Sequence, residues 1–380
     1  MPTAGLHNKT ILVLSPQSWG TIYLSKHHYA IELAKLGNTV YFLNPPAETG
    51  LKKGIALKKS EAHPNLFIID HALPFPYKLK FHIMSIFHWL MKFHLRRIIK
   101  KIPGKIDIVW SFDIGNLYPF KYFPNMYRVF HPVDEPLNKE AMQSARGAQV
   151  IFSVTKEILQ KYHSYNIPSY FINHGVSTDF LNAAAPKVNN DSIHVGFSGN
   201  LTRNDIDREV LLEIIKTNRD IVFNFWGPVN SAQSNIGGAA DDISSQFIAA
   251  LKQLENVILH GAVPSAKLAT AIQGVDAFLI CYDVNKDQSK GTNYHKVMEY
   301  ISTGKVIVAN NITTYAALPN LVQMVAERDS NAHLLPLFNE VIKNIHHYNS
   351  PALQEERRCY AASNTYQKQI QKIEKLLYAE

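Results

Sequence analysis

Cysteine is scarce in this chain of 380 residues, and long uncharged apolar runs are missing. The two cysteines, Cys281 and Cys359, lie far apart without metal-ligand spacing, which disfavours a disulfide framework and favours a reducing cytosol. No apolar run approaches the ~18 residues that a membrane-spanning helix needs. The run from Ile11 to Leu14 is too short for a signal peptide and is expected to form a first strand.

Acidic residues are outnumbered by basic ones, 31 to 39, which gives a net charge of +8 and a pI near 9.2. A basic surface favours anionic partners such as nucleotides, nucleic acid or lipid head groups. With 46% hydrophobic residues, the composition is typical of a soluble globular protein of roughly two domains.

Strand and helix patterns alternate along the first half of the chain. A β-branched strand at residues 9–15 is followed by a helical pattern at 24–36 that stops at Gly37, and by a second strand at 38–43. Further strands are predicted at residues 106–112, 126–130, 148–154 and 169–172. The alternation predicts a doubly wound parallel sheet.

A small, polar stretch at residues 181–192 resembles a linker, and the alternation then restarts. Strands are predicted at 192–197, 221–226, 257–259, 275–281 and 305–309, with helices at 206–216, 243–254, 264–273 and 293–303. The tail at 355–377 is predicted to be helical and to pack back on the other domain.

Residues 285–310 form the most informative stretch. A polar loop with Lys286, Lys290 and Gly291 leaves the carboxyl end of a predicted strand and enters the N-terminus of a helix, a position that favours an anion such as phosphate. Lys296 and Glu299 lie one turn apart on that helix and can address one ligand together. The alternative is an ordinary strand–helix–strand unit with solvated lysines.

Two further sets of residues are open to more than one interpretation. His131 and Asp134 follow a predicted strand and are candidates for proton or hydrogen-bond chemistry, although a lone histidine is more often structural. Asp205 and Asp207 form an Asp-x-Asp that can hold a divalent metal. Their place at the start of a helix favours capping, and no metal is predicted.

Residues 77–105 carry eight Lys or Arg and no acid, with many aromatic and aliphatic residues in the middle. A basic helix of this composition is typical of an anionic membrane surface. The alternative is a core helix with a basic exposed face. Nucleic acid is disfavoured as a partner, because the cations lie in one aliphatic helix rather than on an aromatic stacking platform.

Four motifs in sequence order resemble the glycosyltransferase family 4, or group 1, transferases of the GT-B fold. HGVSTDF at 174–180 is similar to the family's HGVD-x-x-F, and VGFSGNL at 195–201 to its G-x-x-G-N-L. NYHKVMEYISTGKVIV at 293–308 is similar to P-x-K-x-x-E-Y-x-A-x-G-K-P-V-V, and FHPVDE at 130–135 to a Y-D-x-V-D-[DE] segment.

The resemblance implies two Rossmann-like domains facing across a cleft: an acceptor domain at 1–183, a nucleotide-sugar donor domain at 184–358, and a C-terminal helix at 359–380. Glu299 would hold the ribose, Arg203 and Lys296 or Lys290 the diphosphate, and His131 or Asp134 would lie near the reacting sugar. The implied catalytic residues are His131, Asp134, Arg203 and Lys296. The implied nucleotide-sugar contacts are Gly20, Gly199, Asn200, Arg203, His260, Gly261, Val263, Lys290, Gly291, Thr292, Asn293, Lys296 and Glu299.

Three departures from the family pattern affect the implied sugar contacts. Gly291 stands where many members have Glu, Asp205 and Asp207 stand where a second cation is usual, and the proline before the Lys296 motif is absent.

The implied activity is transfer of a sugar from a nucleoside-diphosphate sugar to a glycan or lipid-linked hydroxyl, retaining and without metal or cofactor. The expected setting is polysaccharide biosynthesis in the cytoplasm, peripheral at the inner face of the membrane. The alternatives are a nucleotide-sugar epimerase of the same fold and a catalytically silent nucleotide-binding relative.

Overall fold

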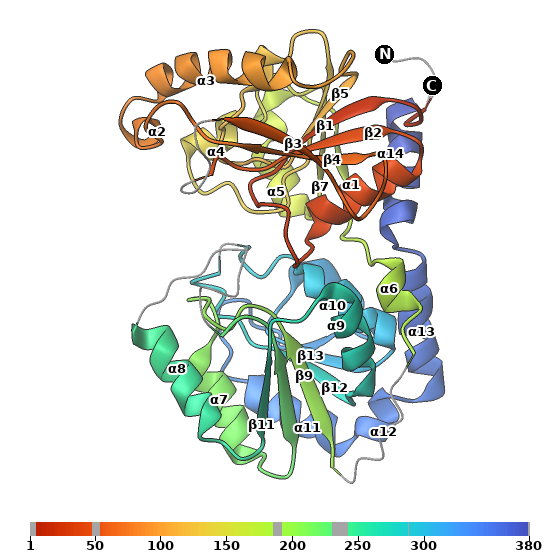
Figure 1. Cartoon of the computed structure of the whole chain (residues 1–380). Coiled ribbons are helices and arrows are strands. Elements are labelled where there is room, and N and C mark those ends of the chain that lie inside the picture. Colours follow the sequence, from red (N-terminus) through yellow and green to blue (C-terminus); the bar gives the residue numbers. More distant parts are fainter. Residues whose placement is uncertain (1–4, 48–53, 185–191, 230–241, 288, 379–380) are drawn as a thin grey trace. The chain divides into compact units, whose positions relative to one another are not determined.

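The computed structural model describes residues 5–47, 54–184, 192–229, 242–287 and 289–378. The chain divides into two compact units, Met1–Asn173 with Gln369–Glu380, and His174–Lys368. Each unit is a sheet of mainly parallel strands flanked by helices (Figure 1), which confirms the predicted α/β fold class. Most of the predicted linker, residues 185–191, lies outside the described residues.

The sheet of the first unit has the strand order β3-β4-β2-β1-β5-β6-β7-β8, and every pairing is parallel except that of β3 with β4. Its strands are β1 (Thr10–Leu14), β2 (Thr39–Leu43), β3 (Ile55–Lys59), β4 (Leu66–His71), β5 (Ile108–Ser111), β6 (Tyr127–Phe130), β7 (Val150–Ser153) and β8 (Ser169–Phe171). Its helices are α1 (Ser25–Lys35), α2 (Leu79–His82), α3 (Met84–Ile99), α4 (Lys139–Gln143) and α5 (Lys156–Lys161), with short 3₁₀ turns η1 (Phe120–Tyr122) and η2 (His163–Tyr165).

Helices cover both faces of this sheet because successive strand side chains point to opposite faces. Leu12 and Leu14 of β1 belong to the core cluster that also contains Phe87 and Met91 of α3. Helix α1 packs against β2 and β4 on the other face (Figure 1).

The predicted single basic helix over 77–105 is wrong in its extent. The segment forms two helices, α2 and α3, separated at Ile83, whose φ of −140° and ψ of 76° lie outside the helical region. Helix α3 ends at Ile99, shortly before Pro103, which lacks the N–H that a helix interior requires.

The sheet of the second unit is parallel throughout, with the strand order β11-β10-β9-β12-β13-β14. Its strands are β9 (His194–Ser198), β10 (Val222–Trp226), β11 (Val257–Gly261), β12 (Ala277–Ile280), β13 (Val306–Ala309) and β14 (Gln323–Met324). Its helices are α6 (Thr178–Leu181), α7 (Arg208–Thr217), α8 (Asp242–Lys252), α9 (Ser265–Ala271), α10 (His295–Thr303), α11 (Leu334–Lys343), α12 (Ile345–Tyr348) and α13 (Pro351–Ala362), with turns η4 (Ile272–Gly274) and η5 (Thr313–Tyr315).

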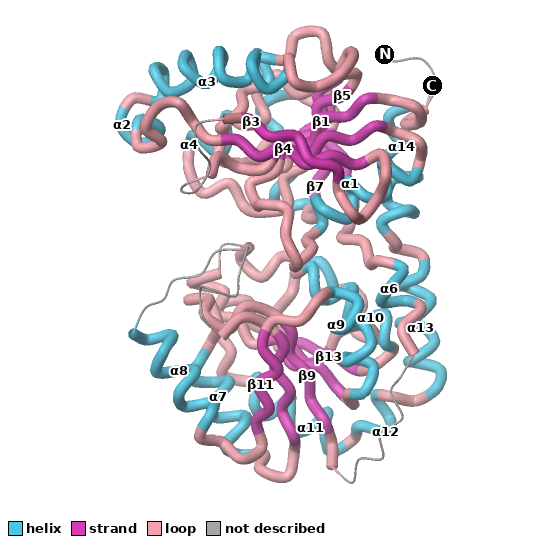
Figure 2. Tube along the Cα trace, in the orientation of Figure 1, coloured by secondary structure: helices cyan, strands magenta, loops and turns pink. Residues whose placement is uncertain are grey.

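Helices again lie on both sides of the strands (Figure 2). Helix α8 contacts β11, and α11 contacts α7 and β13, while α10 contacts α6 and α13. Helix α10 ends at Gly304, whose φ of 81° is the left-handed conformation that glycine adopts without strain. The predicted helix stop at Gly304 is therefore confirmed.

The helical tail consists of two helices rather than one, α13 and α14 (Tyr366–Tyr378). From Gln369 onwards the chain belongs to the first unit. Glu374 accepts a hydrogen bond from the Leu6 main-chain N–H at 2.7 Å, and the Tyr378 hydroxyl donates to the Gly5 carbonyl at 3.1 Å. The predicted return of the C-terminal helix to the first domain is confirmed.

No helix in the described ranges combines the length and apolarity needed to cross a bilayer.

Candidate functional site

The strand order of the second unit places two loops at a topological switch point. Strands β9 and β12 are neighbours, yet β9 continues into α7 and β12 into α10, and these two helices contact different neighbours, α11 and α13. Ligands of open α/β sheets bind outside the carboxyl ends of strands at such a point. The residues that follow β9 and β12 are therefore the first place to look for a site.

Glycine main chain forms the edge beside this point. The Gly199 N–H donates to the Trp226 carbonyl at 2.8 Å, and the Gly227 N–H donates to the Gly261 carbonyl at 2.8 Å. A Cβ on Gly227, whose φ is +146°, would lie 1.8 Å from the Gly199 oxygen. The loops after β9, β10 and β11 thus approach each other closely through their backbones, which side chains at these positions would prevent.

Lys296 of α10 reaches this edge. Its ammonium donates to the Tyr282 hydroxyl at 2.6 Å and lies 4.1 Å from the centre of the Phe197 ring. A Cβ on Gly199 would lie 2.4 Å from Nζ, so the absence of a side chain there makes room for the cation. Burial, followed by the positive charge of Arg203, lowers the pKa of Lys296 to about 7.

Glu299 lies one turn further along α10 and is only 8% exposed. Burial raises the pKa of its carboxyl to about 8, and the charge of Lys296 offsets part of that effect. His295 Nδ1 lies 3.4 Å from Glu299 Oε1. Burial thus disfavours the charged forms of both Lys296 and Glu299, which are one turn apart on α10. Such a pair is typical of a site that receives a charged or hydroxyl-rich ligand.

Arg203, in the loop after β9, is held by a neighbouring acid. Its Nε donates to Asp205 Oδ1 at 2.8 Å, its Nη2 pairs with Asp205 Oδ2, and Nη2 lies 3.7 Å from Asp287 Oδ1. Hydrogen bonding to Asp205 raises the pKa of Arg203, so the guanidinium is charged at every accessible pH. In this structure the Asp205 carboxylate partly neutralises that positive charge.

The Asp-x-Asp of the sequence serves two structural purposes. Asp207 caps α7 by accepting from the Val210 N–H at 3.3 Å, which confirms the predicted capping, and Asp205 binds Arg203. Among the described residues no group of three or more His, Cys, Asp or Glu side chains is placed to hold a metal ion.

Asp287 organises the loop between β12 and α10. It is fully buried and accepts from the Ser289 N–H at 3.0 Å, the Gly291 N–H at 3.1 Å and the Tyr294 hydroxyl at 2.8 Å. The Gly291 N–H, predicted to face a diphosphate, is therefore donated to Asp287 in this structure. A Cβ on Gly291, whose φ is +65°, would lie 2.7 Å from the Asn311 main-chain oxygen, so a side chain at this position would clash with the backbone.

The other predicted contacts of this unit lie in these loops or, for His260 and Gly261, at the end of β11. Asn200 follows Gly199 after β9, and its side chain accepts from the Thr202 N–H at 2.9 Å. His260 stacks on Trp226 with ring centres 4.7 Å apart, and its Nε2 is 3.0 Å from Asn224 Oδ1. Val263 lies just beyond the end of β11, while Lys290, Thr292 and Asn293 lie between Asp287 and α10.

In the first unit, His131 follows β6 and is completely buried. Its ring lies 5.0 Å from the Phe112 ring and 4.9 Å from the Tyr29 ring, and Trp110 Nε1 donates to its Nδ1 at 3.3 Å. Burial and the nearby charge of Lys26 lower the pKa of His131 to about 3. The imidazole is therefore neutral at physiological pH and cannot act there as a cationic acid.

Lys26, which the sequence analysis missed, joins this group. It is 2% exposed, and its ammonium donates to Gln17 in the loop between β1 and α1, the loop that also contains Gly20. Burial lowers the pKa of Lys26, and the charge of Asp134 raises it. The predicted residues His131 and Asp134 thus share their surroundings with a buried lysine.

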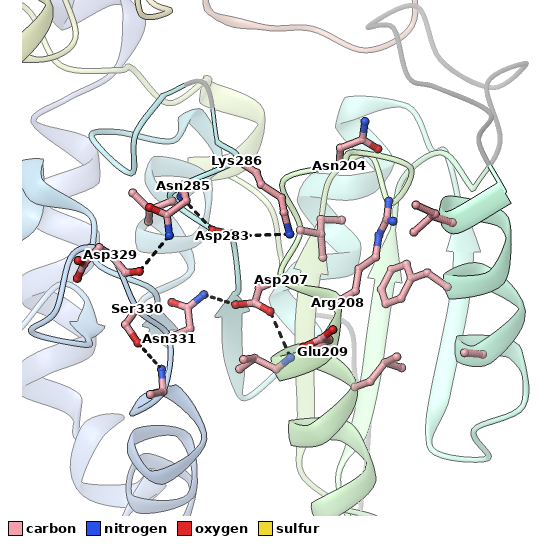
Figure 3. Close-up of a pocket in the computed structure, with 18 of the residues that line it drawn as sticks. Asn204, Asp207, Arg208, Glu209, Asp283, Asn285, Lys286, Asp329, Ser330 and Asn331 are labelled. Atoms are coloured by element: carbon pink, nitrogen blue, oxygen red, sulfur yellow. Dashed lines mark hydrogen bonds and ion pairs between the residues drawn. The ribbon is translucent and has the colours of Figure 1, made fainter.

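A separate hollow of about 750 Å³ lies beside the loops after β9 and β12 (Figure 3). Its lining includes four acids, Asp207, Glu209, Asp283 and Asp329, and none of the predicted nucleotide-sugar contacts. Lys286, which the sequence suggested as a phosphate ligand, is paired there with Asp283 at 3.0 Å. This acidic lining disfavours a diphosphate in the hollow.

Several solved structures are similar to this chain over nearly its whole length. Sucrose-phosphate synthase from Thermosynechococcus elongatus aligns with a TM-score of 0.72 at 10% identity, covering 98% of each chain. The Anabaena protein HepE, in complex with UDP and glucose, aligns with a TM-score of 0.66 at 13% identity, covering 97% of this chain and 99% of its own. A Rickettsia africae glycosyltransferase aligns with a TM-score of 0.64 at 15% identity, covering 98% and 100%.

The chain has the GT-B fold. No protein-family model and no curated protein matches its sequence.

Within the GT-B architecture, the structure brings Gly199, Arg203, Lys296 and Glu299 to one switch point in the second unit. It places Gly20, His131 and Asp134 in the first unit.

The sequence analysis missed two aromatic residues of this GT-B unit. Tyr282 touches both Lys296 and the Arg203 guanidinium, whose carbon lies 5.5 Å from the Tyr282 ring centre. The Tyr300 hydroxyl accepts from the Ser198 N–H at 2.6 Å and so fixes the end of β9. Tyr300 is adjacent to Glu299 in its motif, but no sequence signal relates Tyr282 to Lys296.

Proposed function

We propose that this protein is a glycosyltransferase, which moves a sugar from a nucleoside-diphosphate sugar to a hydroxyl of a glycan or lipid-linked acceptor. The observation that carries the proposal is the pair Lys296 and Glu299, one turn apart on α10 at the switch point of a GT-B unit. Two solved neighbours support a nucleotide-sugar donor, since HepE is known in complex with UDP-glucose and a second neighbour in complex with UDP-2-fluoro glucose.

In this proposal Lys296 stabilises the leaving diphosphate. A diphosphate beside Nζ favours the charged ammonium and raises a pKa that burial has lowered to about 7, so the cation is fully formed when the donor is bound. Arg203 adds a second charge through Nη1, because Asp205 engages Nε and Nη2. Glu299 binds the ribose hydroxyls.

The bond between the anomeric carbon and the diphosphate oxygen breaks, and the acceptor oxygen forms the new bond to that carbon while its proton leaves. We propose attack on the face that the diphosphate leaves, with retention of configuration and without a metal. We propose that the first unit binds the acceptor. There Lys26 and Asp134 provide charge, and His131, whose pKa is about 3, acts only as a neutral hydrogen-bonding or packing group.

The test is to incubate the full chain with a panel of nucleoside-diphosphate sugars and to measure released nucleoside diphosphate with and without hydroxyl acceptors. A Lys296→Gln variant is compared with Lys252→Gln, which removes an exposed lysine of the same unit. We expect release from at least one donor and its loss only in Lys296→Gln. Tight nucleotide binding without turnover, or sugar epimerisation without diphosphate release, would refute the proposal.

We also propose that α2 and α3 dock the first unit on an anionic membrane. The exposed large apolar residues of this segment, called here the aromatic face, are Phe81 of α2, Ile86, Trp89 and Phe93 of α3, and the flanking Tyr77 and Ile83. Phe81 is 71% and Trp89 58% exposed, although α3 has already buried its opposite side in the core. Monomeric proteins rarely expose such a group of large apolar side chains.

Cations lie beside the aromatic rings at both ends of the aromatic face, which favours lipid over an apolar protein partner. Lys80 Nζ lies 5.8 Å from the Phe81 ring, and the Arg96 guanidinium lies 5.9 Å from the Phe93 ring. Residues 77–105 contain no acid to oppose anionic head groups. Aromatic side chains and cations on one amphipathic helix are the features that place a helix at a lipid interface.

Vesicle flotation tests this docking. We compare the wild type with a Lys92/Arg96/Arg97/Lys100 charge-neutral variant and with a control that neutralises four exposed lysines of the second unit, Lys216, Lys252, Lys267 and Lys343. Phosphatidylglycerol vesicles should retain the wild type and the control but not the first variant, at about 1 kcal/mol per cation lost. Equal flotation of all three proteins would exclude the role of α3.

A further inference from the structure

A second hollow, of about 720 Å³, lies in the first unit between α3, the crossover from β5 to β6, and the turn before β7. Three of its lining residues carry a fixed positive charge, Lys121, Arg128 and Arg146, and His88 of α3 lies with them. None of the lining residues is acidic. The hollow is separate in sequence and unit from the loops that carry Lys296 and Glu299.

Arg128 is held rigidly in this hollow. Its Nε donates to the Gly147 carbonyl at 2.6 Å, and its Nη1 donates to the Phe123 and Met126 carbonyls at 3.2 and 3.1 Å. These bonds fix the plane of the guanidinium without a carboxylate partner and leave its full charge in place. A guanidinium fixed in this way loses little side-chain entropy when it binds an anion.

The walls around Arg128 are tied together. The Tyr122 hydroxyl donates to the His88 carbonyl at 2.9 Å, and His88 Nε2 lies 2.8 Å from the Asn116 carbonyl, so the crossover is fixed to α3 at two points. Gly147, whose φ is +89°, brings the turn before β7 against the crossover, where its Cβ would lie 3.4 Å from Phe120 Cβ. The hollow is therefore formed by the fold itself.

The charge pattern has an additional consequence for His88. Burial lowers the pKa of His88, the hydrogen bond to the Asn116 carbonyl offsets part of that effect, and the charges of Lys121 and Lys80 lower the pKa further. His88 is therefore neutral and donates its Nε2 proton to the Asn116 carbonyl. The net charge of the lining residues is then set by Lys121, Arg128 and Arg146, all positive.

We propose that this hollow binds a phosphate group, as a phosphomonoester or phosphodiester, at Arg128, Arg146 and Lys121. Guanidinium groups match the oxygen geometry of phosphate, and three cations suit a group that carries up to two negative charges. The volume is that of a small-molecule site rather than a single-ion site. The phosphate can belong to a soluble sugar or glycerol phosphate or to a lipid head group.

Calorimetric titration of the full chain distinguishes the two sources. Inorganic phosphate and glycerol 3-phosphate are the soluble probes. The lipid probe is dihexanoyl phosphatidic acid below its critical micelle concentration, so that no bilayer is present to which α3 could bind. The site variant is Lys121→Gln/Arg146→Gln, which changes two exposed side chains and leaves Arg128 and its carbonyl contacts intact. The matched control is Lys105→Gln/Lys156→Gln, two exposed lysines of the same unit outside the lining.

We expect binding of at least one probe and roughly 10- to 100-fold weaker binding by the site variant, with the control unchanged. Binding of the lipid probe alone assigns a head group, and binding of the soluble probes assigns a free phosphate ester. No binding of any probe by the wild type, or equal binding by wild type and site variant, would overturn the proposal. Thermal unfolding of both variants verifies that the fold is retained. Donor turnover is measured in parallel, because this site does not depend on the proposed transferase activity.

Discussion

Replacement of Glu299 by Gln should change how the stability of the second unit depends on pH. Burial raises the pKa of this carboxyl from 4.5 to about 8. The folded unit therefore holds the Glu299 proton more tightly than the unfolded chain does. The resulting stabilisation is fully present below pH 4.5 and is lost as the pH rises towards 8.

The size of the effect follows from the rise in the pKa of Glu299 on folding. Each pH unit within the window is worth at most about 1.4 kcal/mol, and the whole window roughly 4–5 kcal/mol. The free energy of unfolding of Glu299→Gln, relative to the wild type, should therefore rise with pH between about 5 and 7.5. Lys296 contributes the opposite trend, because its lowered pKa makes stability increase as pH rises from about 7 towards 10.5. Loss of the Glu299 charge lowers the pKa of Lys296 further in Glu299→Gln, which makes the difference between the two proteins rise with pH in the same direction.

Urea denaturation measures the difference between the two proteins at each pH. Samples equilibrated at a series of pH values are pulse-labelled with deuterium at one common pH, and peptides from β9, β12 and β13 report the second unit alone. Glu255→Gln, an exposed glutamate of the same unit, is the matched control and should show a flat difference. A flat or falling difference for Glu299→Gln would refute the reasoning, because Glu299 would then be ionised in the folded state.

Three further predictions concern the two units separately. Lys296→Gln should lower kcat by roughly 10²–10³ fold through loss of a charge that stabilises the leaving group, whereas Lys252→Gln should leave steady-state kinetics unchanged. His131 has a pKa of about 3, so the pH–rate profile between pH 5 and 9 should have the same shape in His131→Gln as in the wild type; a limb that disappears would contradict its neutral state. Gly227→Ala should unfold the second unit or cost at least about 3 kcal/mol, because its Cβ would meet a main-chain oxygen at 1.8 Å, while Gly261→Ala, with nothing within 4 Å, should cost only about 1 kcal/mol in thermal unfolding.

The sequence by itself determined the architecture and the location of the candidate site. Buried parallel strands require continuous β-branched runs, and each crossover helix requires its own periodicity, so the strand–helix alternation predicted both sheets. The order of strands and helices also placed Lys296 and Glu299 after β12, because residues in that loop or in the first two turns of the helix that follows it must lie near the carboxyl edge of the sheet.

Only the tertiary structure decided what those residues contact. Arg203, after β9, lies beside Asp287 and Tyr282, which follow β12, and Lys296 of α10 lies beside Phe197 of β9. These contacts join segments that are far apart in the sequence, and local sequence patterns do not encode such distances. The burial of Lys26 was also decided by the tertiary structure, because its position in the helical pattern of residues 24–36 does not predict whether it is buried or exposed. The pKa values of Lys296 and Glu299 follow from desolvation, which exists only once the whole unit has folded around them.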